Sequence, residues 1–114
     1  MKLPFAEVVR IDPRKLRDYA LSSEHPSGRF KAVFFATLGF TRGNWEKLDL
    51  ELRRLALQST AELGERNGFG QKYVIRGRIT GPTGRSAEVV VVWIVLEGEG
   101  VPRLVTVYPG VAAP

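Results

Sequence analysis

The only histidine of the chain, His25, lies just before a predicted helix whose first turn carries Arg29 and Lys31. The amino end of a helix presents free N–H groups and a partial positive charge, so it attracts anions. Cations in that first turn are unfavourable for the same reason, and a bound phosphate would offset the cost. Histidine titrates near neutrality without perturbation. The stretch therefore predicts a phosphate site where His25 takes the proton of a ribose 2′-hydroxyl while Lys31 and an arginine stabilise the charge growing on the phosphate oxygens.

A structural role for His25 stays open beside this interpretation. In that role the imidazole, followed by Pro26, lies in the turn between two helices and hydrogen-bonds to the backbone. The sequence has no cysteine, which excludes disulfides, thiolate nucleophiles and cysteine metal sites. One histidine and scattered carboxylates give no metal-ligand pattern, and neither a Ser-His-Asp set nor a phosphate-binding P-loop is present. We therefore predict no metal and no cofactor.

The charge balance of the chain favours an anionic partner. The 114 residues carry a net charge of +5, and nucleic acid is the commonest partner of basic proteins, although many small proteins are basic for solubility alone. Hydrophobic residues make up 44% of the chain and charged ones 25%, as in an ordinary globular domain. The longest apolar run, 89–96, is too short to cross a membrane, and the first residues do not resemble a leader. We expect one domain, 1–114, with a cytoplasmic location.

Three helices are predicted in the first half of the chain. The first begins with Asp12 as N-cap and Pro13 as first residue, and ends near Ser22. The second runs from about Ser27 to Gly39, with Phe40 folding back onto it. A third begins between residues 41 and 44 and fades near 59–64, before a loop at 62–70. The residues expected on the buried sides are Leu16, Tyr19 and Ala20, then Phe30, Val33, Phe34, Thr37 and Leu38, then Trp45, Leu48, Leu52 and Leu55, while Glu46, Lys47, Glu51, Arg53 and Arg54 are expected to face water.

The second half of the chain changes to a period of two, which is typical of strands. Residues 71–80 alternate apolar and basic side chains, which predicts a strand with one face of each kind. Residues 85–96, the returning strand, are apolar on both sides along most of their length, and 103–109 form a third strand, with residues 8–11 as a short edge strand. The fold class is therefore α+β. Two or three N-terminal helices (about 12–60) pack on one face of a small antiparallel meander (about 71–109), and the other face stays partly open.

A conditional register decides what the open face carries. If Gly81 and Gly84 flank the hairpin turn, Lys72 lies opposite Trp93, and Arg76 and Arg78 share that face. Three cations around an aromatic ring suit a phosphate backbone with a base stacked on the ring. A solvated strand face whose arginine stems merely cover apolar surface is the alternative. A shift of one residue would move every side chain to the other face.

The segments "KLRDYAL", "EHPSGRFKAVFFATLGF", "FGQKYVIRGRITGPTGR" and "PRLVTVYP" together resemble a family of uncharacterised bacterial domains with an HPxG(R/K)xK helix, an LTGPxGR hairpin and a PRLVTxYP strand. The resemblance covers nearly the whole chain. The layout is similar to that of the barnase–EndoU–colicin–RelE class of small metal-independent ribonucleases, many of which are toxins. That class has helices first and a curved antiparallel sheet afterwards.

This resemblance implies an endoribonuclease toxin that is neutralised by a small acidic antitoxin-like protein. It implies His25 as base, Lys31 as electrostatic partner, Arg76 or Arg78 as the phosphate ligand, and Thr106 and Tyr108 in the cleft. Many members carry a second imidazole where this chain has Phe30, so Tyr108, Tyr73 or a lysine is left as proton donor. A non-catalytic RNA- or protein-binding module and a structural interaction protein remain as alternatives. The residues expected to bind RNA around the site are Arg29, Lys72, Arg78, Arg85 and Trp93.

Overall fold

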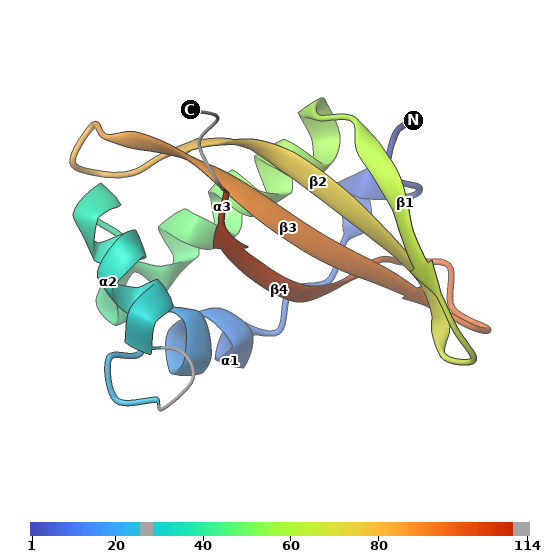
Figure 1. The fold of residues 1–114 in the computed structure, drawn as a ribbon, viewed down its shortest axis with the longest axis horizontal. Coiled ribbons are helices and arrows are strands. Elements are labelled where there is room, and N and C mark those ends of the chain that lie inside the picture. Colours follow the sequence, from blue (N-terminus) through green and yellow to red (C-terminus); the bar gives the residue numbers. More distant parts are fainter. Residues whose placement is uncertain (26–28, 111–114) are drawn as a thin grey trace.

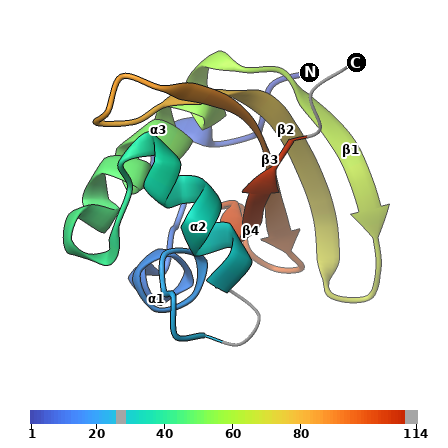
Figure 2. The same cartoon turned by 60° about the vertical axis from the view of Figure 1, so that its left-hand side comes forward.

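The computed structural model describes residues 1–25 and 29–110 and shows an α+β fold (Figure 1). Its antiparallel sheet has the order β1-β2-β3-β4, formed by Ala61–Arg66, Gly70–Thr80, Ser86–Leu96 and Arg103–Pro109. Helix α3 lies across one face of the sheet, whereas α1 and α2 flank the β4 edge (Figures 1 and 2). The predicted fold class, with helices before an antiparallel meander, is confirmed. A short 3₁₀ turn, η1 (Ala6–Val8), precedes these elements.

The first helix is split into two parts. In α1 (Pro13–Lys15) the Asp12 carboxylate accepts a hydrogen bond from the Arg14 N–H at 3.0 Å, so the predicted N-cap is confirmed. The chain then widens into a π-helical turn, η2 (Leu16–Ala20), in which the Leu21 N–H donates to the Leu16 carbonyl at 2.8 Å. Leu16 and Ala20 are buried, as their spacing predicts.

Helix α2 (Arg29–Leu38) ends in the cap predicted from Gly39 and Phe40. Gly39 has a φ of 96° and donates to the Ala36 carbonyl at 2.9 Å, while the Phe40 N–H donates to the Phe35 carbonyl at 3.0 Å. The Phe35 and Phe40 rings meet edge to face with centroids 6.5 Å apart. The expected start of this helix near Ser27 lies outside the described residues.

The buried side of α2 differs from the prediction. Phe30 and Val33 are 72% and 67% exposed, and only Leu38 of the expected set is fully buried. Phe35, which is not among the residues expected on the buried side, is 0% exposed. The reason is the C-terminal cap: because it holds Phe35 against Phe40, it fixes the rotation of the helix and turns Phe30 and Val33 to solvent.

Helix α3 (Trp45–Gln58), preceded by the 3₁₀ turn η3 (Arg42–Asn44), buries Leu48, Leu52 and Leu55 as predicted. Of the residues expected to face water, Glu46 and Lys47 are exposed. The expectation is wrong for Glu51, Arg53 and Arg54, which are half-buried and bond to the backbone of other segments. Arg53 donates to the Val9 carbonyl at 2.9 Å, Arg54 donates to the Arg78 carbonyl at 2.8 Å, and Glu51 accepts from the Thr80 N–H at 2.9 Å. These bonds tie α3 to the backbone of its neighbours.

Residues 61–66 form strand β1, where the sequence analysis placed the end of a helix and a loop. The strand pairs with β2, with Ala61 opposite Ile75 and Leu63 opposite Tyr73. Apart from Ala61 it is exposed or half-buried, so it carries no alternating apolar pattern that could have revealed it. The expected edge strand at 8–11 is reduced to one parallel bridge between Arg10 and Arg103.

The β2–β3 hairpin is shifted by one residue from the predicted register. Gly81 pairs with Arg85, to whose carbonyl its N–H donates at 3.0 Å, because Gly84 occupies an additional loop position with a φ of 84°. Trp93 therefore lies opposite Tyr73 on the helix-facing side and is 0% exposed, which corrects its predicted place among the cations. The basic residues of β2 therefore share a sheet face with β3 side chains other than those predicted. Arg78 lies opposite Glu88, Arg76 opposite Val90, and Lys72 opposite Ile94.

The docking of α2 on the hairpin gives a testable prediction on stability. A Cβ at Gly39 would come within 3.0 Å of Thr83, whereas one at Gly84 would meet nothing within 4 Å, and both glycines have a positive φ. We expect Gly84→Ala to lower the free energy of unfolding by about 1 kcal/mol through backbone strain. Gly39→Ala should lower it by about 2–3 kcal/mol, because steric overlap with the hairpin adds to the strain. Urea denaturation of both variants measures the difference, and equal losses would contradict this docking.

Candidate functional site

Lys31 of α2 and Thr106 of β4 join the helical part to the sheet. The Lys31 Nζ donates to the Thr106 hydroxyl at 2.8 Å across 75 residues of sequence. Lys31 lies in the first turn of α2, and Thr106 follows the bulge at Val105, where the β3–β4 register shifts. The structure thus brings together two of the residues that the sequence analysis assigned to catalysis.

Two aromatic rings complete this cluster. The Lys31 Nζ lies 5.0 Å from the centroid of the Tyr19 ring, a distance typical of a cation–π contact. The Tyr19 ring in turn meets the His25 ring edge to face, with centroids 4.6 Å apart and an interplanar angle of 67°. We call His25, Tyr19, Lys31 and Thr106 the lysine cluster. It connects the π-helical turn, the start of α2 and strand β4.

Burial lowers the pKa of Lys31 from its ordinary value of 10.5, because the half-buried ammonium has lost part of its hydration. Within the described part of the chain, no carboxylate forms an ion pair with it to offset this effect. The Thr106 hydroxyl and the Tyr19 ring are the polar contacts that stabilise the ammonium. A partly desolvated cation without an acidic partner is suited to bind an anion.

Tyr108 and Arg76 lie on the outer face of the sheet, which Thr106 of the lysine cluster also faces. The outer face is the side that points away from α3. Thr106 lies opposite Val92, and Tyr108 opposite Val90, so both side chains point to this face. Arg76 lies opposite Val90 from the other side, and it is exposed with no ion pair among the described residues. Arg76, Val90 and Tyr108 thus form one row across β2, β3 and β4. The adjacent row contains Val92 and ends at Thr106 of the lysine cluster.

Of the remaining predicted residues, Arg29 adjoins the lysine cluster, since its backbone N–H donates to the His25 carbonyl at 3.0 Å, and the others lie on β2, on β3 and in the hairpin loop. Arg29 is exposed, with its guanidinium carbon 5.0 Å from the centroid of the Phe30 ring. Lys72 is 3.8 Å from the Glu65 carboxylate and Arg78 is 3.4 Å from that of Glu88, so both cations have acidic neighbours. Arg85 lies exposed in the hairpin loop.

Trp93 cannot stack with a ligand, because it has no exposed surface. Its indole N–H is buried without a hydrogen-bond partner in the described residues. Tyr73, one of the expected proton donors, faces the same side as Trp93 and packs against the core.

Tyr19 is the residue that sequence reasoning missed. Its helical spacing with Leu16 indicated a core position, and it does pack against the core while its ring reaches His25 and Lys31. A tyrosine often combines an apolar ring with a polar tip at such a boundary, but nothing in the linear pattern indicated which residues it would meet.

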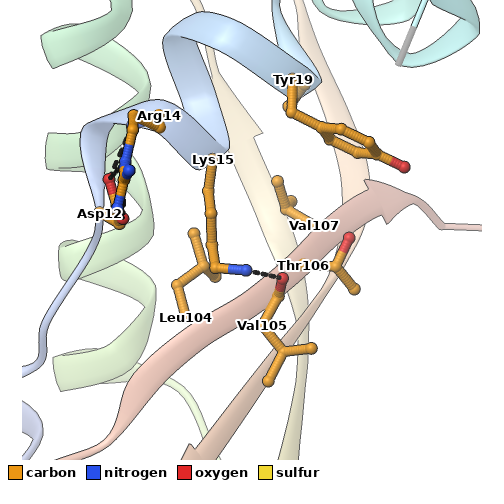
Figure 3. A pocket seen from close by; sticks show the side chains of 9 residues that line it. Asp12, Arg14, Lys15, Tyr19, Leu104, Val105, Thr106 and Val107 are labelled. Carbon is orange, nitrogen blue, oxygen red and sulfur yellow. Dashed lines mark hydrogen bonds and ion pairs between the residues drawn. The ribbon is translucent and has the colours of Figure 1, made fainter. Parts of the chain in front are cut away.

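Tyr19 and Thr106 also line a pocket of about 370 Å³ between the first helix and β4 (Figure 3). Asp12 and Arg14 form an ion pair at the opposite end of this pocket. The part of the chain that the structure describes contains no cluster of three or more His, Cys, Asp or Glu side chains that could hold a metal ion. Over the same residues, no helix has the length and apolar character needed to cross a bilayer.

The titration of Lys31 tests the environment of the cluster. We expect its midpoint, followed by NMR at the Cε resonance, to lie below 10.5. Just below that pH the unfolded chain then binds more protons than the folded one, so the free energy of unfolding rises with pH as Lys31 loses its proton. Lys31→Met should remove this rise, as urea denaturation across the same pH range would show. A midpoint at or above 10.5 would indicate a hydrated or acid-paired lysine and contradict the description.

Comparisons with known proteins place this geometry in context. No curated protein matches the chain significantly. One chain of a solved contact-dependent growth inhibition toxin–immunity protein complex from Klebsiella pneumoniae 342 has the same fold, with a TM-score of 0.69 and 14% sequence identity over 94% of this chain and 97% of that one. Residues 2–111 match a family described as a domain of unknown function, DUF6883. The chain therefore belongs to the DUF6883 family.

Proposed function

We propose that the protein is a metal-independent endoribonuclease that acts as a toxin and is neutralised by a small acidic partner protein. The observation that carries the proposal is the lysine cluster: a half-buried ammonium bonded to Thr106, in contact with Tyr19, whose ring meets His25. The fold shared with a chain of a toxin–immunity complex supports the toxin part. An RNA substrate implies action in the cytoplasm.

In the proposed reaction His25 removes the proton of a ribose 2′-hydroxyl, and the 2′-oxygen attacks the neighbouring phosphorus. The bond between phosphorus and the 5′-oxygen breaks, which leaves a 2′,3′-cyclic phosphate and a 5′-hydroxyl end. Lys31 and Arg76 stabilise the negative charge on the phosphate oxygens in the transition state. Thr106 keeps the Lys31 ammonium directed toward β4.

The leaving 5′-oxygen needs a proton, and two phenols border the site. Tyr108 lies on the outer face two residues after Thr106, and Tyr19 is in contact with Lys31. Either can serve as the acid. Comparing the cleavage rates of Tyr19→Phe and Tyr108→Phe with that of wild type identifies the general acid. The variant that lacks it should cleave about 10²–10⁴-fold more slowly.

Cleavage of a labelled single-stranded oligoribonucleotide in the presence of EDTA tests the proposal. We expect wild type to leave cyclic phosphate ends and to spare the matching oligodeoxynucleotide, which lacks the 2′-hydroxyl. His25→Ala and Lys31→Met should each lower the rate about 100-fold or more. Lys47→Met, which removes an exposed lysine of α3, is the matched control and should cleave like wild type.

The outcomes separate this function from its alternatives. Binding of the oligonucleotide without cleavage by any version would favour a non-catalytic RNA-binding module. Neither binding nor cleavage would favour a protein-binding or structural role. Cleavage that survives both substitutions would place the chemistry elsewhere in the molecule.

The surface next to the site supports a protein partner. Phe30 and Val33 expose apolar side chains on α2, and Arg29 lies over the Phe30 ring. An exposed apolar ridge beside cations is typical of an interaction surface, and the net charge of +5 favours an acidic partner. A protein that covers Phe30 would also cover the amino end of α2, and so block access to Lys31.

A growth experiment tests this surface. We expect the chain to slow the growth of a bacterial host. A small acidic partner, sought among the products of neighbouring genes, should restore growth when it is co-expressed. Phe30→Glu should abolish the rescue while leaving the toxicity, because the added charge disrupts the docking ridge. Leu50→Glu, at a 66% exposed position of α3, is the control and should be rescued like wild type. Rescue of Phe30→Glu would show that the partner docks elsewhere.

A further inference from the structure

A groove runs along the edge of β4, on the side that faces the first helix. It consists of two adjoining pockets of about 370 and 410 Å³, each within the range of small-ligand sites. They share Asp12, Lys15, Leu104 and Val105 in their walls. The bulge at Val105 turns its carbonyl toward the groove, where it accepts a hydrogen bond from the Lys15 Nζ at 3.3 Å (Figure 3).

The rim of the groove is cationic. The two pockets are lined by one carboxylate, Asp12, and by the four cations Arg10, Arg14, Lys15 and Arg103. Arg14 pairs with Asp12 at 2.7 Å, and its hydrogen bonds lower the pKa of this carboxyl to about 2. Arg103 pairs with Glu99 at 2.8 Å. Lys15 and Arg10 are exposed and have no ion pair within residues 1–25 and 29–110, so they are available to an anionic ligand.

The floor of the groove is apolar. The half-buried Val105 and Ile94 supply most of its apolar surface, and Ile11, Leu104 and Val107, which also line it, are almost fully buried. A ligand that contacts both the rim and the floor combines an anionic group with an apolar part. A nucleotide has both, with phosphate for the rim and a base for the floor.

The groove is continuous with the lysine cluster, since Tyr19 and Thr106 belong to both. We propose that it binds a single-stranded nucleotide next to the cleaved bond, with the base on Val105 and Ile94 and the phosphate on Lys15 and Arg10. The assignment to a position beside the cleaved bond rests on the proposed function, whereas the binding itself does not. An acidic peptide of a partner protein is the competing ligand.

The test is the affinity of the full chain for a fluorescent, non-cleavable 2′-O-methyl oligonucleotide, measured by anisotropy over a series of salt concentrations. Arg10→Gln combined with Lys15→Gln should weaken binding tenfold or more. It should also flatten the salt dependence by about 1.4 in log–log slope, twice the roughly 0.7 per phosphate contact of a single strand. Lys2→Gln combined with Lys47→Gln removes two exposed lysines elsewhere and should bind like wild type.

Two further arms separate the possible sources of binding. Inorganic polyphosphate at equal charge should compete less well than the unlabelled oligonucleotide, because it has no base for the apolar floor. Equal competition would reduce the groove to an electrostatic patch and overturn the proposal. Unchanged oligonucleotide binding by the groove variant, with lost binding of a polyglutamate peptide, would assign the groove to an acidic protein and also overturn it.

His25→Ala, which removes the proposed base and leaves every lysine and arginine in place, distinguishes this proposal from the ribonuclease proposal. If both hold, this variant loses cleavage and still binds the oligonucleotide, whereas the groove variant loses affinity. If wild type never cleaves but the groove variant still binds tenfold more weakly, the nucleotide groove stands and the ribonuclease proposal fails. If wild type cleaves and the groove variant binds and cleaves equally well, the groove proposal fails alone.

Discussion

The burial of Phe35 is the constraint on which the site depends. In a helix, residues four and seven positions apart lie on one face, so Lys31 shares its face with Phe35 and Leu38. Both apolar residues are buried, Phe35 against Phe40 in the C-terminal cap. Since this packing fixes the rotation of α2, Lys31 must point toward β4 as well. Its ammonium loses hydration there and bonds to Thr106. The apolar core thus imposes the position of the polar cluster.

The same rotation explains why one face of α2 remains exposed. Phe30 and Val33 lie outside the stripe formed by Phe35 and Leu38, so they cannot be buried with it. Burying Phe30 instead would rotate Lys31 away from Thr106 and break the cap at Gly39. The exposure of Phe30 and Val33 and the partial burial of the Lys31 ammonium therefore both follow from the packing of Phe35. This links the surface proposed for a partner to the site that the partner would block.

Elements whose ends have local signals could be predicted from the sequence. Asp12 and Pro13 indicate a helix start, Gly39 and Phe40 indicate a helix end, and the bounds of β4 follow from its alternation. Features that depend on tertiary contacts could not be predicted from the sequence. Strand β1 has no apolar face of its own and exists because β2 offers it a pairing edge. The error in the predicted buried side of α2 has a similar origin. Phe30 and Phe35 are both aromatic, and only the C-terminal cap determines which of them is buried.

The hairpin register shows how far a single residue changes the candidate site. With Gly84 inside the loop, Trp93 moves to the core, and Val90 and Val92 occupy the outer face between Arg76 and β4. Recognition by stacking on Trp93 is thereby lost, whereas His25, Lys31 and Thr106 keep their expected proximity through Tyr19. Their proximity does not depend on the hairpin, because it is set by α2 and the β4 bulge. The apolar contact that we propose for a nucleotide therefore lies in the groove lined by Tyr19 and Val105, at the edge of β4.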